Sequence, residues 1–101
     1  MTSKEGIYIF DEKIKQITFH YDFQNQRDML IEECAELIQA INKCKRGVEG
    51  SFDNFVEELA DVQVMLLQME EYLGKEVIDS IIEKKLNRQI ERIEKELRDE
   101  E

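Results

Sequence analysis

The sequence lacks proline altogether and has only four glycines among its 101 residues. Proline and glycine are the residues that most strongly interrupt helices, so their scarcity favours long helices. Good helix formers such as glutamate, lysine, leucine and glutamine are abundant instead. We therefore expect an all-α protein.

Positive charge is also scarce. Fourteen Lys and Arg stand against 24 Asp and Glu, which gives a formal net charge of −10 at pH 7. This balance argues against a general affinity for nucleic acid or for an anionic membrane surface, because both are bound through cationic patches. No apolar run exceeds four residues, so we expect no membrane-spanning segment. The apolar stretch near the start ends at Asp11, which is too short for a secretory signal.

Histidine and cysteine are rare, which narrows the possible metal and redox chemistry. The chain has His20, Cys34 and Cys44 and no others, so neither a zinc cluster nor the Glu-x-x-His motifs of di-iron bundles can be assembled. Cys34 and Cys44 fall within one expected helix, where ten residues place them about 15 Å apart, too far for a disulfide. A reducing, cytoplasmic setting is the expectation that follows.

Apolar residues recur at helical spacing in four segments of a single domain that spans residues 1–101. The expected helices cover about residues 11–19, 23–46, 51–73 and 75–97. An extended lead-in is possible at residues 7–10, and residues 98–101 should fray. Asp22 is the expected N-cap of the second helix, and Ser51, Asp53 or Asn54 that of the third.

Short connections between these helices predict an antiparallel bundle of about four helices. The apolar arcs of the second and third helices exceed about 120°, and the fourth helix carries its own stripe. A chain of this length cannot bury all of these surfaces by itself. We therefore expect a homo-oligomer, a dimer or a tetramer, in which helices of neighbouring subunits complete each site.

Four carboxylates occupy the core-facing stripes of the second and third expected helices. At about 100° per residue, Glu33 lies inside the apolar arc of its helix and Glu36 lies near the edge of that arc. Glu58 and Asp61 stand in the same relation on the next helix. If the two stripes pack together, the four carboxylates converge.

Four anions at one place need a compensating charge, since buried isolated charge is costly and like charges promote their own protonation. Ligands that offer only oxygen suit Mg²⁺ or Mn²⁺. The alternative is that each pair lies at the boundary of the core and reaches solvent or lysines. The matched angular position of the two pairs favours the metal site.

The segments that carry these carboxylates resemble a known family. Residues 30–41 (Leu-Ile-Glu-Glu-Cys-Ala-Glu-Leu-Ile-Gln-Ala-Ile) and 56–62 (Val-Glu-Glu-Leu-Ala-Asp-Val) are similar to the MazG-type all-α nucleoside triphosphate pyrophosphohydrolases. The family pattern is Glu-Glu-x-x-Glu, a spacer, and Glu-x-x-Asp. It is met here by Glu32, Glu33, Glu36, Glu58 and Asp61. The resemblance extends over roughly residues 23–93.

The resemblance implies Mg²⁺-dependent hydrolysis of a (deoxy)nucleoside triphosphate to the monophosphate and pyrophosphate, with Mn²⁺ as a possible substitute. It implies that Glu33, Glu36, Glu58 and Asp61 are metal ligands. Glu32 would bind a second ion through water or, together with Glu33, act in catalysis by orienting the nucleophilic water.

The resemblance also extends to basic residues of the fourth helix and to a glutamine. Lys85, Arg88 and Arg92 share one helix face and are expected to bind substrate phosphates, although they could equally form an exposed stripe that pairs with neighbouring glutamates. Gln26 is expected to contact the base or ribose, or to be a polar residue at the edge of the core. We interpret Met65 as an ordinary core residue.

Two other functions remain open at this point. The first is a phosphoribosyl-ATP pyrophosphatase-like enzyme, which would share the metal chemistry and differ in substrate. The second is a non-catalytic helical interaction module, which would have no need of inward-facing carboxylates.

Overall fold

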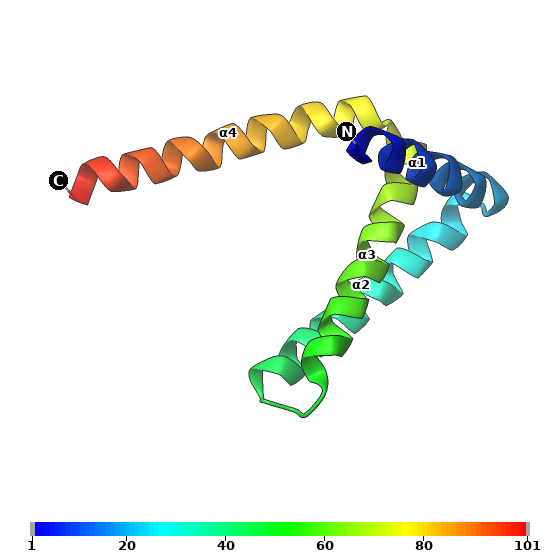
Figure 1. Cartoon of the computed structure of the whole chain (residues 1–101), viewed down its shortest axis with the longest axis horizontal. Helices are drawn as coiled ribbons and strands as arrows, with labels where there is room; N and C mark the ends of the chain where they lie inside the picture. Colours follow the sequence, from blue (N-terminus) through cyan, green and yellow to red (C-terminus); the bar gives the residue numbers. More distant parts are fainter. Residues whose placement is uncertain (1, 101) are drawn as a thin grey trace.

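The computed structural model describes residues 2–100, and the side chains of residues 11–100. Four helices follow one another: α1 (Thr2–His20), α2 (Phe23–Lys45), α3 (Ser51–Leu73) and α4 (Lys75–Glu100) (Figure 1). Residues 2–100 contain no strand, which confirms the all-α prediction. The extended lead-in at residues 7–10 is wrong, because α1 already begins at Thr2. α4 continues to Glu100, so residues 98–100 of the expected frayed tail are helical.

α2 and α3 form an antiparallel hairpin, which is the most extensive helix pair in the described part of the chain (Figure 1). The loop between them contains Gly47 and Gly50, with φ values of 71° and 76°. Glycine adopts this left-handed conformation without strain because it has no Cβ. Gly50 is the N-cap of α3 and offers no side chain, so the capping expected from Ser51, Asp53 or Asn54 is wrong: the helix already begins at Ser51.

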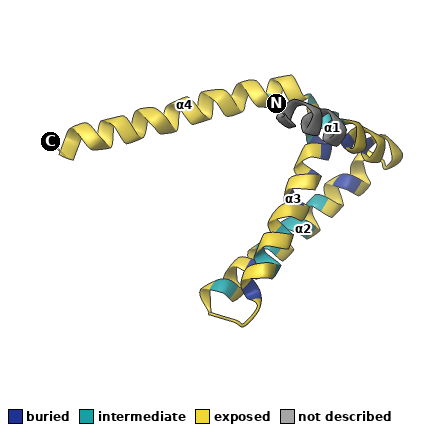
Figure 2. Ribbon diagram, in the orientation of Figure 1, coloured by how far each residue is buried: buried dark blue, intermediate teal, exposed yellow. Residues whose placement is uncertain are grey.

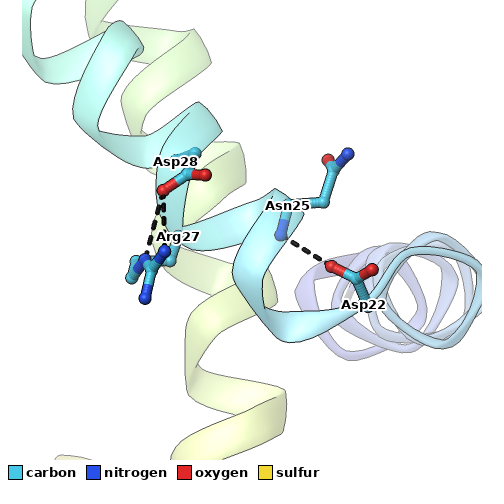
Figure 3. Close-up of polar contacts among 4 residues, drawn as sticks. All are labelled: Asp22, Asn25, Arg27 and Asp28. Carbon is cyan, nitrogen blue, oxygen red and sulfur yellow. Dashed lines mark hydrogen bonds and ion pairs between the residues drawn. The ribbon is translucent and has the colours of Figure 1, made fainter.

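The start of α2 agrees with the sequence. The carboxylate of Asp22 accepts a hydrogen bond of 2.7 Å from the backbone N–H of Asn25, as Figure 3 shows. This bond satisfies one of the N–H groups that a helix leaves without a partner in its first turn. The side chains of Arg27 and Asp28, one turn further on, form an exposed ion pair of 3.1 Å (Figure 3). The N-cap prediction for Asp22 is therefore confirmed.

A cluster of hydrogen bonds joins the end of α1 to α2 and α3. The side-chain nitrogen of Gln26 donates to the carbonyls of Thr18 (2.9 Å) and Tyr21 (3.3 Å) and to the hydroxyl of Tyr72 (3.0 Å). The Tyr72 hydroxyl also lies within hydrogen-bond distance of both carbonyls, and its ring packs edge-on against Phe23. These bonds satisfy the carbonyls that the end of α1 leaves open.

α4 does not return to the other three helices. It leaves α3 at Gly74, whose φ and ψ are 101° and 100°, and extends away from the hairpin (Figure 1). None of residues 75–100 is buried (Figure 2), and within the described chain α4 packs mainly against α3. The expected bundle of about four helices is thus not formed inside one chain, because the backbone at Gly74 directs α4 away from α2.

The core is small and lies between α2 and α3 and between α1 and α3. The buried apolar residues in the described part are Ile14, Ala40, Val62, Met65 and Met69. Many larger apolar side chains remain exposed, including Leu59 and Leu66 on α3 and Leu86 on α4. Among residues 2–100, no helix combines the length and the apolar character needed to cross a membrane.

Candidate metal centre

Two helices of the hairpin supply the acidic residues that the sequence singles out. Glu33 and Glu36 lie on α2, and Glu58 and Asp61 lie on α3. Residues three apart project from the same side of a helix, so each pair occupies one face. The antiparallel packing of α2 on α3 brings the two faces to the same level of the hairpin.

Three of these carboxylates converge. Glu33, Glu36 and Glu58 each offer one carboxylate oxygen, and these three oxygens all lie within 4.8 Å of one another. Glu33 and Glu58 are partly buried between the helices, whereas Glu36 is exposed. The fourth expected member, Asp61, is exposed and lies outside this group. We refer to Glu33, Glu36 and Glu58 as the carboxylate cluster.

The carboxylate cluster is electrostatically unfavourable as it stands. Partial burial, followed by the negative charges of Glu36 and Asp61, raises the pKa of Glu33 above its ordinary value. Partial burial and then the charge of Glu36 raise the pKa of Glu58 in the same way. The negative charge of Asp61 contributes to both raised pKa values, although its oxygens lie outside the cluster.

Among residues 11–100, no basic side chain forms an ion pair with the carboxylate cluster. The ion pairs within residues 11–100 are Arg27–Asp28 and Lys95–Asp99, both away from the cluster. One oxygen of Glu33 and one of Glu58 are enclosed and have no hydrogen-bond partner in the described structure. Enclosed oxygens normally have a partner, because burying them without one is costly. A divalent cation that prefers oxygen ligands fits this donor set.

Glu32 lies beside the cluster and not in it. It is the residue before Glu33 on α2, so its side chain is rotated by about 100° from that of Glu33, and it is exposed. Its carboxylate is therefore in contact with solvent next to the place where a cation would be held.

The basic residues expected at the site lie elsewhere in the chain. Lys85, Arg88 and Arg92 are exposed on the extended part of α4, where Lys85 and Arg88 line a shallow hollow of about 270 Å³. Glu58 lies fifteen residues before Leu73, about 22 Å along α3, and α4 then points away (Figure 1). Within one described chain, these cations and the carboxylate cluster are not brought together.

Gln26, which the sequence offers as a contact of the base or ribose, is buried and engaged in hydrogen bonds within the chain. Its side chain is 1% exposed, and its nitrogen is engaged with Thr18, Tyr21 and Tyr72. Its side-chain oxygen is enclosed and has no hydrogen-bond partner in the described part of the chain. Gln26 thus helps to hold three helices together, and its side-chain oxygen is enclosed among them.

Gln68 is a buried polar residue that the sequence patterns did not single out. It lies on α3 and is 5% exposed. The signal was its spacing: it follows Asp61 by seven residues, which returns the helix to nearly the same face after two turns. A polar residue that repeats the position of a candidate site residue was therefore visible in the sequence.

The fold and the carboxylate cluster define an all-α protein with a candidate site for a divalent cation. Residues 22–93 match the model of the MazG nucleotide pyrophosphohydrolase domain. The match covers more than half of the chain, so the protein belongs to the MazG family, whose members are typically dependent on divalent metal and act on nucleotides. Among the curated proteins and the solved structures that were compared, none matches the chain.

Proposed function

We propose that this protein hydrolyses a (deoxy)nucleoside triphosphate to the monophosphate and pyrophosphate, with Mg²⁺ or Mn²⁺ as its cofactor. The observation that carries the proposal is the convergence of three carboxylate oxygens from α2 and α3 within 4.8 Å. The enclosed, unpartnered oxygens of Glu33 and Glu58 support a bound cation as the missing partner. Membership of the MazG family supports the class of reaction.

Glu33, Glu36, Glu58 and Asp61 would hold the metal. Such an ion, when bound, neutralises phosphate oxygens and lowers the pKa of coordinated water. Glu33 and Glu58 are held between the helices, so they provide fixed oxygens. Glu36 and Asp61 are exposed at the mouth of the cluster, where a triphosphate can approach.

The reaction adds one water across a phosphoanhydride. The water oxygen bonds to the α-phosphorus, the bond from the α-phosphorus to the oxygen bridging the β-phosphate breaks, and pyrophosphate leaves with that oxygen. The water must also give up a proton. Glu32, exposed next to the cluster, orients the water and accepts this proton, while Glu33 positions the reacting groups from inside the cluster.

A second copy of the chain would complete the site. α4 presents apolar side chains to solvent along its length, including Ile82, Leu86 and Ile90, and an exposed apolar stripe of this kind marks an association surface. The same helix carries Lys85, Arg88 and Arg92, which suit phosphate oxygens. A dimer or tetramer in which α4 packs against a neighbouring hairpin would bury the stripe and supply cations to the triphosphate.

The direct test incubates the full chain with each common NTP and dNTP and with phosphoribosyl-ATP, in the presence of Mg²⁺, and identifies the products by ³¹P NMR. The expected products are one nucleoside monophosphate and one pyrophosphate per turnover, and chelation of the metal should stop the reaction. Orthophosphate as the first product would contradict the proposed reaction. Turnover confined to phosphoribosyl-ATP would replace the proposed substrate class.

A further inference from the structure

One face of the hairpin carries a continuous row of apolar side chains. Leu30 of α2 and Leu66 and Leu73 of α3 line the same hollow, so these sides of the two helices belong to one face. Residues four, seven, eleven or fourteen positions away project to nearly the same side of a helix. We call the resulting set the apolar face: Leu30, Cys34, Leu37 and Ile41 on α2, and Phe52, Phe55, Leu59, Leu66 and Leu73 on α3.

Much of the apolar face is exposed. Leu59 is 42% exposed and Phe52 is 70% exposed, and no member of the face is an acidic or basic residue. α1 packs against another side of α3, where Ile14 lines a hollow together with Val64. An exposed apolar row of this kind marks an association surface.

α4 covers only one end of the apolar face. Ile78 and Ile82, in the first two turns of α4, line the same hollow as Leu66 and Leu73. Beyond Ile82, α4 leaves the hairpin (Figure 1). Its apolar stripe continues there without a partner in the described chain, with members that are 53% to 58% exposed: Leu86, Ile90, Ile93 and Leu97. The chain therefore has an uncovered face on its hairpin and an uncovered stripe on α4.

The two uncovered surfaces match in spacing. The apolar rows are Leu59, Phe55 and Phe52, reading back along α3, and Ile90, Ile93 and Leu97, reading forward along α4. Each row spans seven residues, which is about 10 Å of helix. Antiparallel packing that brings Ile90 level with Leu59 therefore also brings the far ends of the two rows level. Side chains at such spacings pack into the grooves of a facing helix.

The charges of the two surfaces favour the antiparallel direction. Residues 84–92 of α4 contain four cations and one acid, whereas residues 94–100 contain four acids and two cations. On the hairpin, the acids gather at the level of the carboxylate cluster, and residues 42–47, at the loop end, contain three cations and no acid. An antiparallel α4 sets opposite charges at the same levels. The reverse direction would set like charges there, which is unfavourable.

A second copy of the chain can supply the helix that fits the apolar face. Within one chain, Gly74, with φ 101° and ψ 100°, directs α4 away from its own hairpin (Figure 1). Two copies related by a two-fold axis each offer one free stripe and one free face. A reciprocal exchange therefore covers both surfaces of both chains and leaves no copy of either surface open to a third chain.

We propose that residues 86–97 of α4 bind antiparallel to α3 on the apolar face of a second copy, and that two chains exchange these segments reciprocally. The inference rests on the proposed function only for the participation of a second copy. It adds the surface that α4 occupies, the direction in which it binds and the residues that face one another.

The native Cys34 lies where it can report this register. Glu33 and Glu58 lie at one level of the hairpin because their oxygens converge, and Cys34 and Leu59 directly follow them. Cys34 and Leu59 therefore also lie close to one level, on the apolar face. A residue of α4 that lies beside Leu59 and is turned toward α2 should come close to Cys34.

Gln89 meets both conditions. It directly precedes Ile90, which would face Leu59, and it lies at the edge of the apolar stripe that an antiparallel α4 turns toward α2. In a full chain that also carries Cys44→Ser, Gln89→Cys should therefore form a disulfide with Cys34 of the second copy. The protein is oxidised with diamide in the absence of metal and nucleotide, and electrophoresis without reductant measures the covalent dimer.

Glu96→Cys in the same background is the matched control. Glu96 is also exposed and lies on the same side of α4, seven residues or about 10 Å further along. Gln89→Cys should form the covalent dimer at least about tenfold faster than Glu96→Cys, because a disulfide needs Cα atoms within about 7 Å. Adding Cys34→Ser to Gln89→Cys should abolish the dimer. Circular dichroism checks that each variant keeps its helices.

Three outcomes would overturn the inference. A disulfide formed within one chain would show that α4 folds back onto its own hairpin. Equal rates for Gln89→Cys and Glu96→Cys would contradict the register. A covalent dimer that persists after Cys34→Ser would show that the α4 helices of two copies pair with each other.

The cross-linking result is independent of hydrolysis. If the covalent dimer forms as expected but no triphosphate is hydrolysed, the exchange of α4 stands and the proposed function is wrong. If triphosphates are hydrolysed but Gln89→Cys gives no covalent dimer with Cys34, α4 binds elsewhere. The inference is then wrong while the proposed reaction stands.

Discussion

The hairpin of α2 and α3 and the extended helix α4 have similar sequence patterns and opposite surroundings. α3 buries five of its residues, including Val62, Met65 and Met69, whereas none of residues 75–100 is buried (Figure 2). Both helices carry an apolar stripe at helical spacing. The difference is that α3 has a partner helix in its own chain. An amphipathic stripe thus predicts that a surface will be covered, and leaves open which chain covers it.

The two regions also differ in charge. The hairpin holds the carboxylate cluster with no basic partner in residues 11–100. Residues 84–92 of α4 contain four cations and a single carboxylate, Glu91, in a chain with a net charge of −10. Within one chain, the proposed metal ligands therefore lie together on the hairpin, whereas the proposed phosphate-binding cations lie apart from them on α4.

The largest expected effect is on turnover. Glu36→Gln and Asp61→Asn should each lower kcat/KM by about 10²- to 10³-fold, because each removes a carboxylate expected to hold the metal. Glu57→Gln is the matched control, since Glu57 is an exposed glutamate directly before Glu58. It should retain activity. Steady-state kinetics and circular dichroism of each variant separate lost chemistry from lost folding. An active Asp61→Asn enzyme would restrict the ligand set to the carboxylate cluster.

The next effect concerns the association of chains through α4. Leu86→Asp should dissociate the expected oligomer, because it places a charge in the exposed apolar stripe where a second copy would pack. Leu86 is 54% exposed in the single chain, so the change should leave the fold of the monomer intact. Asn87→Asp adds a similar charge one residue away, beside the stripe, and should leave the oligomer intact. Light scattering after size-exclusion chromatography measures both. A monomeric wild type would contradict the packing proposed for α4.

A smaller effect is expected on stability in the presence of metal. Mg²⁺ at one hundred times its dissociation constant should stabilise the folded chain by about 2.7 kcal/mol, since it binds the folded state only. Glu58→Gln should lose this gain. Without metal, the same variant should melt at a slightly higher temperature than wild type, because it removes one of the clustered like charges. Thermal melts with and without Mg²⁺ test this. A non-catalytic interaction module would show no metal-dependent shift.

The pH dependence of stability, measured with and without Mg²⁺, tests the same carboxylates. The pKa values of Glu33 and Glu58 are raised on folding from an ordinary 4.5. Groups of this kind favour folding when protonated, so their contribution is complete below pH 4.5 and is lost as pH rises through the raised folded values. Mg²⁺ requires the ionised carboxylates, so its stabilisation should grow over the same range. Metal-free stability should fall with rising pH while the Mg²⁺-dependent gain increases. Parallel curves would show that the metal binds elsewhere.

The sequence predicted features that depend on neighbouring residues better than features that depend on contacts between distant residues. The N-cap at Asp22, the glycine loop and the shared phase of the two acidic pairs follow from local geometry, and the structure contains the first two and brings three of the four carboxylates together. Asp61 is at the edge of its helix face, where a helical-wheel angle does not fix the direction of the side chain. The spacing of residues along the helix therefore could not predict whether the Asp61 side chain joins the cluster.

Other features depended on contacts between distant residues. Gln26 is held by Tyr72, which lies 46 residues away, so its burial could not be inferred from its neighbours in sequence. The direction of α4 depends on the two backbone angles of Gly74. The spacing of apolar residues predicts that residues 75–97 form a helix. The direction of that helix depends on the backbone angles of Gly74, and glycine can adopt many such angles.

The smallest expected effect compares Gly50, in the loop between α2 and α3, with Gly74, which connects α3 to α4. Gly50 has φ 76° and ψ 0°, a left-handed conformation that asparagine tolerates, whereas Gly74 has φ 101° and ψ 100°, which lies outside that region. A Cβ at Gly50 meets no atom within 4 Å, and one at Gly74 meets Val77 at an ordinary 3.8 Å, so backbone strain alone decides the cost.

Gly50→Ala should therefore destabilise the protein by about 1 kcal/mol, and Gly50→Asn should recover most of that loss. Gly74→Asn should recover nothing relative to Gly74→Ala, because asparagine gains no advantage at those angles. Urea denaturation measures all four variants. If Gly74→Ala and Gly74→Asn are both as stable as wild type, the connection adopts another conformation in solution, and α4 is then free to fold back toward its own hairpin.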